Sequence, residues 1–351
     1  MKTMHITGSA PVDFSLNQDN NFNSGLLHAL SSEGFSITAS PLAEIHLFVN
    51  HCQSQYRETL KQNEGKSLHI LLRTEPIPVF PAQYSARVEK KYDLIITIGK
   101  PESLSKRELN FRHPYEYMSN PNLKSTKRHD LQSKLEEIGN KTQFESWSNR
   151  EYSLSLIAAN KVSSRYGENY EKRRVYAKYQ ASNEIAVFGF LWDSSLSEKL
   201  KHRLSVALHA LRNGTIPDVL SLYGKLFTKY KNYHGAPSDK HQVVEKSRYS
   251  LVIENSDTYI SEKLFDAMVG GSIPVYYGPN LREYGLDDEA LVVRHSGSTE
   301  ELLEKLRTMS ENEVKARLSA ISSFLRSEQF QNEWLSEKVY FKIAKSIQAL
   351  T

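Results

Sequence analysis

Short apolar runs separated by more polar segments set the pattern of the first hundred residues. The runs at 45–49, 68–72 and 92–98 are mostly apolar and rich in Ile, Leu and Val. Strands that are apolar on both faces are typical of parallel sheets covered by helices on both sides. The pattern therefore predicts a parallel α/β domain in the first part of the chain.

A second series of strands and helices begins near residue 154. Pro274 cannot donate a backbone hydrogen bond, so it suits the opening of a strand better than a central position. The pair Gly270-Gly271 is expected to end a helix. The amphipathic segment 313–348 predicts terminal helices that can pack back on the first domain. We expect strands at 154–158, 184–188, 251–253, 273–277 and 291–293, and helices at 171–180, 261–269 and 299–309.

A polar segment, 101–150, separates the two series and is rich in Lys, Arg, Asn, Ser and Glu. A chain of 351 residues exceeds the size at which a single core is usual. We therefore predict an N-terminal Rossmann-like domain at 1–150 and a C-terminal Rossmann-like domain at 151–330. Residues 331–351 are predicted to form a helix that packs back on the N-terminal domain.

Composition narrows the functional classes. Hydrophobic residues make up 39% and charged residues 25%, which is typical of a globular protein. The net charge of +4 comes without clusters of Lys and Arg among aromatic residues, so no nucleic-acid partner is expected. No run approaches the ~20 apolar residues of a membrane-spanning helix, and the first residues lack the pattern of a signal peptide. The single cysteine, Cys52, excludes an intrachain disulfide, and we expect a cytoplasmic protein.

Polar residues that suit a nucleotide follow one of the predicted strands of the second series. Glu254 and Asn255 come directly after it, at the edge where open α/β sheets bind ligands. Glu262 and Lys263 open the next helix, whose free N–H groups favour phosphate. Glu262 can accept hydrogen bonds from ribose hydroxyls, and Tyr259 offers a ring and a hydroxyl. The residues alone also fit a simpler interpretation, in which Glu262 only complements the helix dipole and Lys263 is solvated.

The wider segment contains Ile253-Glu254-Asn255-Ser256, Tyr259-Ile260-Ser261-Glu262-Lys263, Ile273-Pro274-Val275 and Gly278-Pro279. This order resembles the donor-binding motif of the α1,3/α1,4-fucosyltransferases, glycosyltransferase family 10, and is closest to its bacterial members. Ser261 replaces the threonine of that family and keeps the hydroxyl group. Shorter matches extend the resemblance over most of residues 154–310; they lie at 157–160, 172–176, 186–189 and 233–235.

The resemblance implies an α/β fold of the GT-B type, in which two Rossmann-like domains face each other across a cleft. It assigns the acceptor side to the domain at 1–150 and the binding of the GDP-sugar donor to the domain at 151–330. It implies an inverting transfer of L-fucose from GDP-β-L-fucose to a hydroxyl of a glycan acceptor, with an α1,3- or α1,4-type linkage. No cofactor and no metal are expected to be required. Animal members carry a membrane anchor that this chain lacks, so we expect a role in bacterial surface polysaccharide, such as lipopolysaccharide O-antigen, with peripheral contact at the inner membrane face.

The roles of individual residues follow from the same resemblance. Arg73-Thr74-Glu75-Pro76 comes after a buried strand, where the family has its general-base glutamate, so Glu75 takes the catalytic role. An arginine of a basic helix contacts the donor phosphates in the family, which leaves Arg173 and Arg174 as candidates and Lys172 as a third. The other expected donor-binding residues are Glu254, Asn255, Tyr259, Ser261, Glu262 and Lys263.

Two alternatives stay open at this point. The motif indicates mostly GDP, so a transferase that uses another GDP-deoxysugar, such as GDP-colitose, fits it as well. A non-catalytic GDP-sugar or glycan-binding protein would keep the donor fold, but its Glu75 would not need to face the donor sugar. The pair Asp287-Asp288 lies in a polar loop and is not expected to hold a metal.

Overall fold

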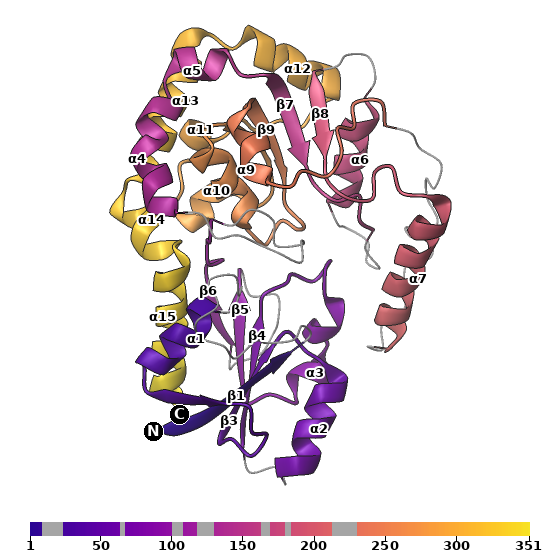
Figure 1. The fold of residues 1–351 in the computed structure, drawn as a ribbon, viewed down its shortest axis with the longest axis vertical. Coiled ribbons are helices and arrows are strands. Elements are labelled where there is room, and N and C mark those ends of the chain that lie inside the picture. The colour runs from indigo at the N-terminus through magenta and orange to yellow at the C-terminus, as the bar shows by residue number, and fades with distance from the viewer. Residues whose placement is uncertain are drawn as a thin grey trace.

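The computed structural model describes residues 1–8, 24–63, 67–99, 108–117, 130–162, 169–179, 184–212 and 230–351. Within these residues the chain forms two parallel sheets, which lie one above the other along the long axis of the molecule (Figure 1). The predicted α/β class, with two parallel-sheet domains, is confirmed.

The N-terminal sheet has six strands in the order β2-β1-β3-β4-β5-β6. Its central strands are buried on both faces, which explains their unbroken apolar sequences. The strands predicted at 45–49, 68–72 and 92–98 are confirmed, whereas β1, β2 and β6 were not predicted. The strands are β1 (Lys2–Gly8), β2 (Phe35–Thr38), β3 (Ile45–Val49), β4 (Leu68–Arg73), β5 (Leu94–Ile98) and β6 (Glu108–Phe111), and the helices are α1 (Ser24–Ser32), α2 (Gln53–Asn63), η1 (Pro81–Tyr84) and α3 (Ala86–Glu89).

The C-terminal sheet has four strands in the order β10-β9-β7-β8. Pro274 lies on the edge strand β10, where a missing N–H is tolerated, and its carbonyl accepts a hydrogen bond from Val293 N at 2.8 Å. The strand predicted at 291–293 is wrong. The Asp287 side chain caps the start of a short helix that includes Leu291, so this residue is helical rather than extended. Beyond it, only a single bridge links Val293 to β10. The strands are β7 (Tyr152–Ile157), β8 (Ile185–Phe188), β9 (Ser247–Ile253) and β10 (Ile273–Tyr277).

Helices cover the C-terminal sheet and begin with recognisable caps. Ser298 and Glu301 form a capping box at the start of α12, and Ser310 and Glu313 form another at the start of α13. The helices predicted at 171–180, 261–269 and 299–309 correspond to α6, α10 and α12. The helices are α6 (Tyr170–Lys178), α7 (Leu196–Arg212), α9 (Lys240–Glu245), α10 (Glu262–Val269), η2 (Leu281–Tyr284), α11 (Asp288–Leu291), α12 (Thr299–Thr308), α13 (Glu311–Leu325) and α14 (Glu328–Glu333).

Three helices connect the two halves of the molecule. α4 (Leu131–Lys141) and α5 (Phe144–Ser148) bury Leu135, Ile138 and Trp147 in the C-terminal core, although they precede residue 150. α15 (Ser336–Leu350) returns to the N-terminal domain and packs beside α1 (Figure 1). The domain boundaries at 150 and 330 stay a prediction. In the described part of the chain, no helix is both long and apolar enough to cross a bilayer.

Candidate active site

The start of α10 is fixed by a buried carboxylate. Glu254 follows the central strand β9 and is 0% exposed. Its carboxylate accepts hydrogen bonds from Ser261 N at 2.8 Å and from Ser261 Oγ at 2.5 Å. Burial raises the pKa of Glu254, while Lys263 and Ser261 act in the opposite direction. Glu254 therefore joins the end of the strand to the N-cap of the helix, and its side chain points into the fold.

Two charged side chains stand at the first turn of α10. Lys263 Nζ lies 3.6 Å from Glu262 Oε1 and donates to Ser261 Oγ at 2.8 Å. About a quarter of each charged side chain is exposed, 27% for Glu262 and 26% for Lys263. Burial would raise the pKa of Glu262, but Lys263, Lys240 and His113 outweigh it and lower the pKa. A carboxylate, an ammonium group and a helix N-terminus thus share one accessible surface.

Arg173 of α6 is tied to the same sheet edge. Its guanidinium Nη2 donates to Ile253 O at 2.8 Å and to Asn255 Oδ1 at 2.7 Å. The side chain is buried and packs over the ring of Tyr170. Asn255 is therefore held by Arg173, and both residues lie at the carboxyl end of β9.

Arg174 and Lys172 take different positions on the same helix. Arg174 is buried; its Nε donates to Glu171 Oε2 at 2.7 Å and its Nη1 to Lys161 O at 2.9 Å. Lys172 is exposed and lies over the ring of Tyr277. The two arginines are thus held by specific partners rather than solvated, and both remain candidates for the donor phosphates.

The loop that carries Glu75 is held at its backbone. Asn50 Nδ2 donates to Thr74 Oγ1 at 2.7 Å, and Thr74 N donates back to Asn50 Oδ1 at 2.9 Å. The carbonyl of Glu75 accepts hydrogen bonds from Gln83 Nε2 at 2.9 Å and from Tyr84 Oη at 2.8 Å. These contacts position Glu75 directly beyond the end of β4.

Charges of the C-terminal domain act on the Glu75 carboxylate. Burial raises its pKa to about 7, with Glu262 adding to the shift and Lys161 and Lys263 opposing it. These three charged groups all belong to the C-terminal half of the sequence. Glu75 and the first turn of α10 are therefore close enough for their charges to influence each other, and the catalytic role of Glu75 stays a prediction. A carboxyl group with a pKa near neutrality is suited to proton transfer.

Tyr259 makes a direct contact between the two domains. Its hydroxyl donates to Thr74 O at 3.1 Å, and its ring meets the His113 ring edge-on, with ring centroids 5.2 Å apart. Gly99 lies against the same loop with φ 108°, and a Cβ there would be 2.9 Å from Thr258 O. The close approach therefore requires glycine. Tyr259 is 5% exposed, so its contacts are with protein groups.

Three residues near the site were not predicted from the sequence. Burial lowers the pKa of His113 to about 4, with Glu262 opposing the shift. Lys240 helps to lower the pKa of Glu262, and its Nζ pairs with Asp266 Oδ2 of α10 at 2.5 Å. Lys161 opposes the rise in the pKa of Glu75. Only Lys161 had a sequence signal, because it directly follows the matched segment 157–160.

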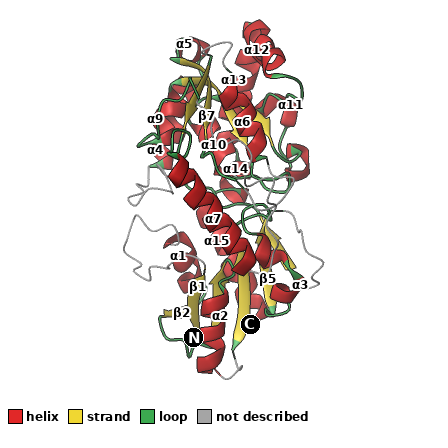
Figure 2. Ribbon diagram, turned by 90° about the vertical axis from the view of Figure 1, so that its right-hand side faces the viewer, coloured by secondary structure: helices red, strands yellow, loops and turns green. Residues whose placement is uncertain are grey.

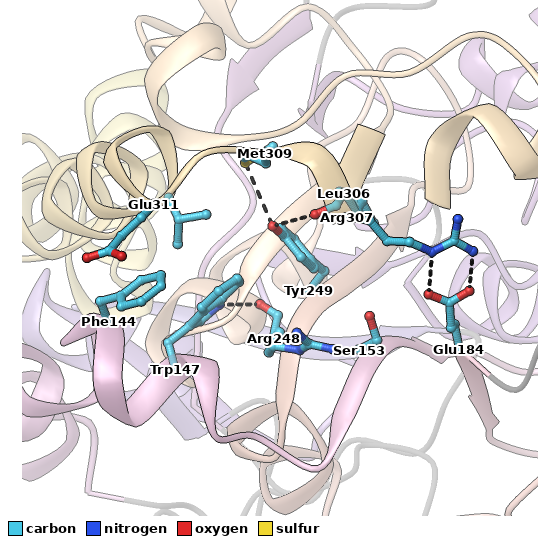
Figure 3. A pocket seen from close by; sticks show the side chains of 11 residues that line it. Phe144, Trp147, Ser153, Glu184, Arg248, Tyr249, Leu306, Arg307, Met309 and Glu311 are labelled. Carbon is cyan, nitrogen blue, oxygen red and sulfur yellow. Dashed lines mark hydrogen bonds and ion pairs between the residues drawn. The ribbon is translucent and has the colours of Figure 1, made fainter. Parts of the chain in front are cut away.

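A cavity of about 160 Å³ lies elsewhere in the C-terminal domain (Figure 3). It is lined by Arg248 and Tyr249, which open β9, whereas the site above lies beyond the other end of that strand. Trp147 Nε1 donates to Arg248 O at 2.6 Å, and Arg307 pairs with Glu184 at 2.6 Å (Figure 3). This cavity is therefore separate from the proposed donor site.

Comparison with known proteins supports the resemblance. No family model matches the chain. The chain is 23% identical over 177 residues to an α-(1,4)-fucosyltransferase of Arabidopsis thaliana, and this match covers 46% of this chain and 43% of that protein. It is 30% identical over 78 residues to a putative fucosyltransferase-like protein of Arabidopsis thaliana, and this match covers 21% of this chain and 15% of that protein. The chain spans less than half the length of these curated relatives.

Solved structures share the fold along nearly the whole chain. An α1,3-fucosyltransferase with GDP has a TM-score of 0.53 at 14% identity, covering 98% of this chain and 88% of that one. HepE of Anabaena, in complex with UDP, has a TM-score of 0.54 at 10% identity, covering 99% and 100%. The fold is GT-B. Part of the sequence is similar to proteins named as fucosyltransferases.

The pair Asp287-Asp288 has structural partners. Asp287 Oδ1 accepts hydrogen bonds from the backbone N–H groups of Glu289 and Ala290, both at 3.1 Å. Asp288 Oδ1 pairs with Arg294 Nε at 2.7 Å. Among the described residues, no group of three or more His, Cys, Asp or Glu side chains is arranged to hold a metal ion. The site residues predicted from the family motif stay predictions, with the placements given above.

Proposed function

We propose that this chain is a glycosyltransferase that moves L-fucose from GDP-β-L-fucose to a hydroxyl of a glycan acceptor, with inversion and an α1,3- or α1,4-type linkage. The observation that carries the proposal is the juxtaposition of Glu75 with Glu262 and Lys263 at the start of α10. The curated relatives named as fucosyltransferases and the shared GT-B fold support it.

Donor binding follows from the chemistry at the first turn of α10. The free N–H groups of the helix and the Lys263 ammonium suit a diphosphate, and the ionised Glu262 carboxylate suits the ribose hydroxyls. Arg173 or Arg174 would add a second cation. Tyr259 and Glu254, which point into protein surroundings, would shape the donor site indirectly by holding the loop and the N-cap of α10.

Glu75 would act as the general base. It would take the proton of the acceptor hydroxyl, whose oxygen attacks the sugar on the face opposite the diphosphate, as in inverting glycoside chemistry. Its raised pKa, about 7, suits this role, because a base works best when its pKa lies near the working pH. The departing GDP would be stabilised by Lys263, by Arg173 or Arg174 and by helix N–H groups. The proposed reaction requires no cofactor or metal.

We also propose a cytoplasmic setting, in which the acceptor belongs to a bacterial surface polysaccharide such as lipopolysaccharide O-antigen. A net charge of +4 suits an enzyme that works near an anionic membrane.

Experiment can distinguish two alternative functions from this proposal. One is a transferase for another GDP-deoxysugar such as GDP-colitose, and the other is a non-catalytic GDP-sugar or glycan-binding protein. The bond from Tyr259 to Thr74, which holds the Glu75 loop beside the proposed donor loop, favours a catalytic protein over a binding protein.

Calorimetric titration without added metal tests the proposal. The purified chain is titrated with GDP, GDP-fucose and GDP-mannose, and with UDP as a control for general binding of nucleoside diphosphates to the GT-B fold. We expect GDP to bind and GDP-fucose to bind better than GDP-mannose. GDP binding without preference for GDP-fucose would indicate that the donor is another GDP-sugar. A lack of binding to guanine nucleotides would refute it.

A further inference from the structure

Helix α7 lies on the outside of the molecule. Figure 1 places it at one side, apart from both sheets, and Figure 2, which views the molecule from that side, draws it in front of the other helices. The helix runs from Leu196 to Arg212 and belongs to the C-terminal half of the chain. Its outer face is therefore available to a partner.

That outer face carries a row of leucines. They recur at intervals of four and three residues, which places them on one side of a helix. Elsewhere in the described chain, the exposed large apolar residues are scattered. The leucine row consists of Leu196 (42% exposed), Leu200 (42%), Leu204 (60%), Leu208 (41%) and Leu211 (56%).

Basic side chains flank the leucine row. At 3.6 residues per turn, Lys201 falls on one side of the row and Lys199 on the other. Arg203 follows Lys199 on that side but is half-buried, with Arg174 and Tyr230 acting on its charge. The single acidic residue of the helix, Glu198, lies away from the row and accepts hydrogen bonds from Ser195 N at 2.8 Å and Ser195 Oγ at 2.9 Å. An apolar row edged by cations is the pattern of helices that lie in the interface of anionic membranes.

The inner face of α7 lies toward the active-site side of the C-terminal domain. His202 and Val206 are less exposed than the leucines. Burial lowers the pKa of His202, and Lys161 and Arg203 lower it further. Since Lys161 also acts on the Glu75 carboxylate, α7 is a neighbour of the proposed site.

We propose that the leucine row of α7 docks on an anionic lipid bilayer. Leucines would enter the acyl boundary, while the flanking lysines reach the anionic headgroups. A second copy of the chain fits less well, because two such rows in contact would bring the lysines that flank one row near those that flank the other. The inference does not depend on the sugar transferred, because docking is measured without donor or acceptor.

Vesicle co-sedimentation of the full chain tests this proposal. The probes are vesicles of phosphatidylcholine alone and of phosphatidylcholine mixed with phosphatidylglycerol. We expect binding to the mixed vesicles, and a loss of roughly tenfold or more in the variant Leu200→Glu/Leu204→Glu. Lys201→Glu should weaken binding to the mixed vesicles by a few-fold, and added salt should weaken binding of the unmodified chain. The matched control is Leu42→Glu, at a leucine that is 70% exposed in the N-terminal domain and should leave binding unchanged.

Circular dichroism and thermal unfolding establish that each variant is folded. Equal sedimentation of the unmodified chain and the double leucine variant would overturn the proposal, as would equal binding to both kinds of vesicle. Light scattering provides the other test. A dimer that Leu204→Glu converts to a monomer would assign the leucine row to a second copy of the chain and would also overturn membrane docking.

Discussion

The hydroxyl of Tyr259 donates a hydrogen bond of 3.1 Å to the carbonyl of Thr74, the residue before Glu75. Tyr259 lies on the loop that leads to the first turn of α10, so this bond joins the proposed donor loop to the loop of the proposed base. The two halves of the site are therefore set relative to each other by a contact between domains. Losing that contact should affect turnover more than the stability of either domain.

Tyr259→Phe should lower kcat several-fold and leave GDP affinity within about twofold, because it removes one hydrogen bond, worth roughly 0.5–1.5 kcal/mol, without removing a donor contact. The matched control is Tyr56→Phe, since Tyr56 Oη also donates to a backbone carbonyl, that of Lys91 at 3.0 Å, away from the site. Both variants should lose similar stability in urea unfolding. Equal kcat values in the two variants would contradict a positioning role for Tyr259.

Glu75→Gln should lower kcat by about 10² to 10⁴, the usual contribution of a general base, while GDP affinity stays nearly unchanged. Glutamine keeps the shape of the side chain and removes the ability to accept the proton. Glu58→Gln, an exposed carboxylate on α2, serves as the control and should be fully active. Turnover that survives in Glu75→Gln would exclude this residue as the base, even if GDP binding is confirmed.

The pH dependence of kcat/KM should report the same carboxyl group. Burial raises the pKa of Glu75 to about 7. A base must be deprotonated to act, so kcat/KM should rise as the pH increases through about 7 and then level off. Lys161 opposes the rise of this pKa, so Lys161→Met should move the midpoint to higher pH. An unchanged midpoint in that variant would show that the pH dependence arises from a group other than Glu75.

The sequence predicted the central strands and the first turn of α10 because these are local patterns. β3 and β4 are buried on both faces and read as unbroken apolar runs. β1 was missed because it mixes apolar residues with polar ones, among them the buried Thr7, which bonds to Gln55 at 2.7 Å. A pairing across 48 residues leaves no periodic signal.

The site shows the same division between local and long-range information. Ser261, Glu262 and Lys263 were placed correctly at the start of a helix because capping is a local property. Glu254 was predicted to contact the donor, but its carboxylate bonds to Ser261, and the sequence cannot distinguish a ligand from a cap as the partner of an acceptor. The approach of His113 to Glu262 depends on how the two domains meet, which no sequence spacing predicts.

Lys263→Ala should weaken GDP binding by about tenfold to a hundredfold, as expected for the loss of a charged group that bonds to phosphate. Its ammonium also lies 3.6 Å from Glu262 Oε1, so the variant leaves that carboxylate without its neighbouring cation. Lys338→Ala, at an exposed lysine of α15, is the control and should bind GDP normally. Unchanged GDP affinity in Lys263→Ala would show that the donor does not bind at the start of α10.

Three histidines form a ladder across the N-terminal sheet. His5, His46 and His69 are in register on β1, β3 and β4, and neighbouring ring centroids are 5.4 and 5.6 Å apart. His46 is fully buried. Burial, followed by the charges of His5 and His69, lowers the pKa of His46 to about 4. Burial also lowers the pKa values of His5 and His69, with Glu58 and Asp93 respectively opposing the shift.

The ladder should make the protein acid-sensitive. The pKa of His46 is about 4 in the folded chain and 6.5 as its ordinary value, so the unfolded chain binds more protons between these pH values. The free energy of unfolding should therefore fall as the pH drops from about 6.5 toward about 4, by an amount on the order of 1–3 kcal/mol.

Urea unfolding at about pH 7 and about pH 5 measures this change in the free energy of unfolding. His46→Gln should reduce the difference between the two pH values, whereas His28→Gln, at an exposed histidine of α1, should leave it unchanged. If His46→Gln keeps the full acid sensitivity, the sensitivity arises outside the ladder.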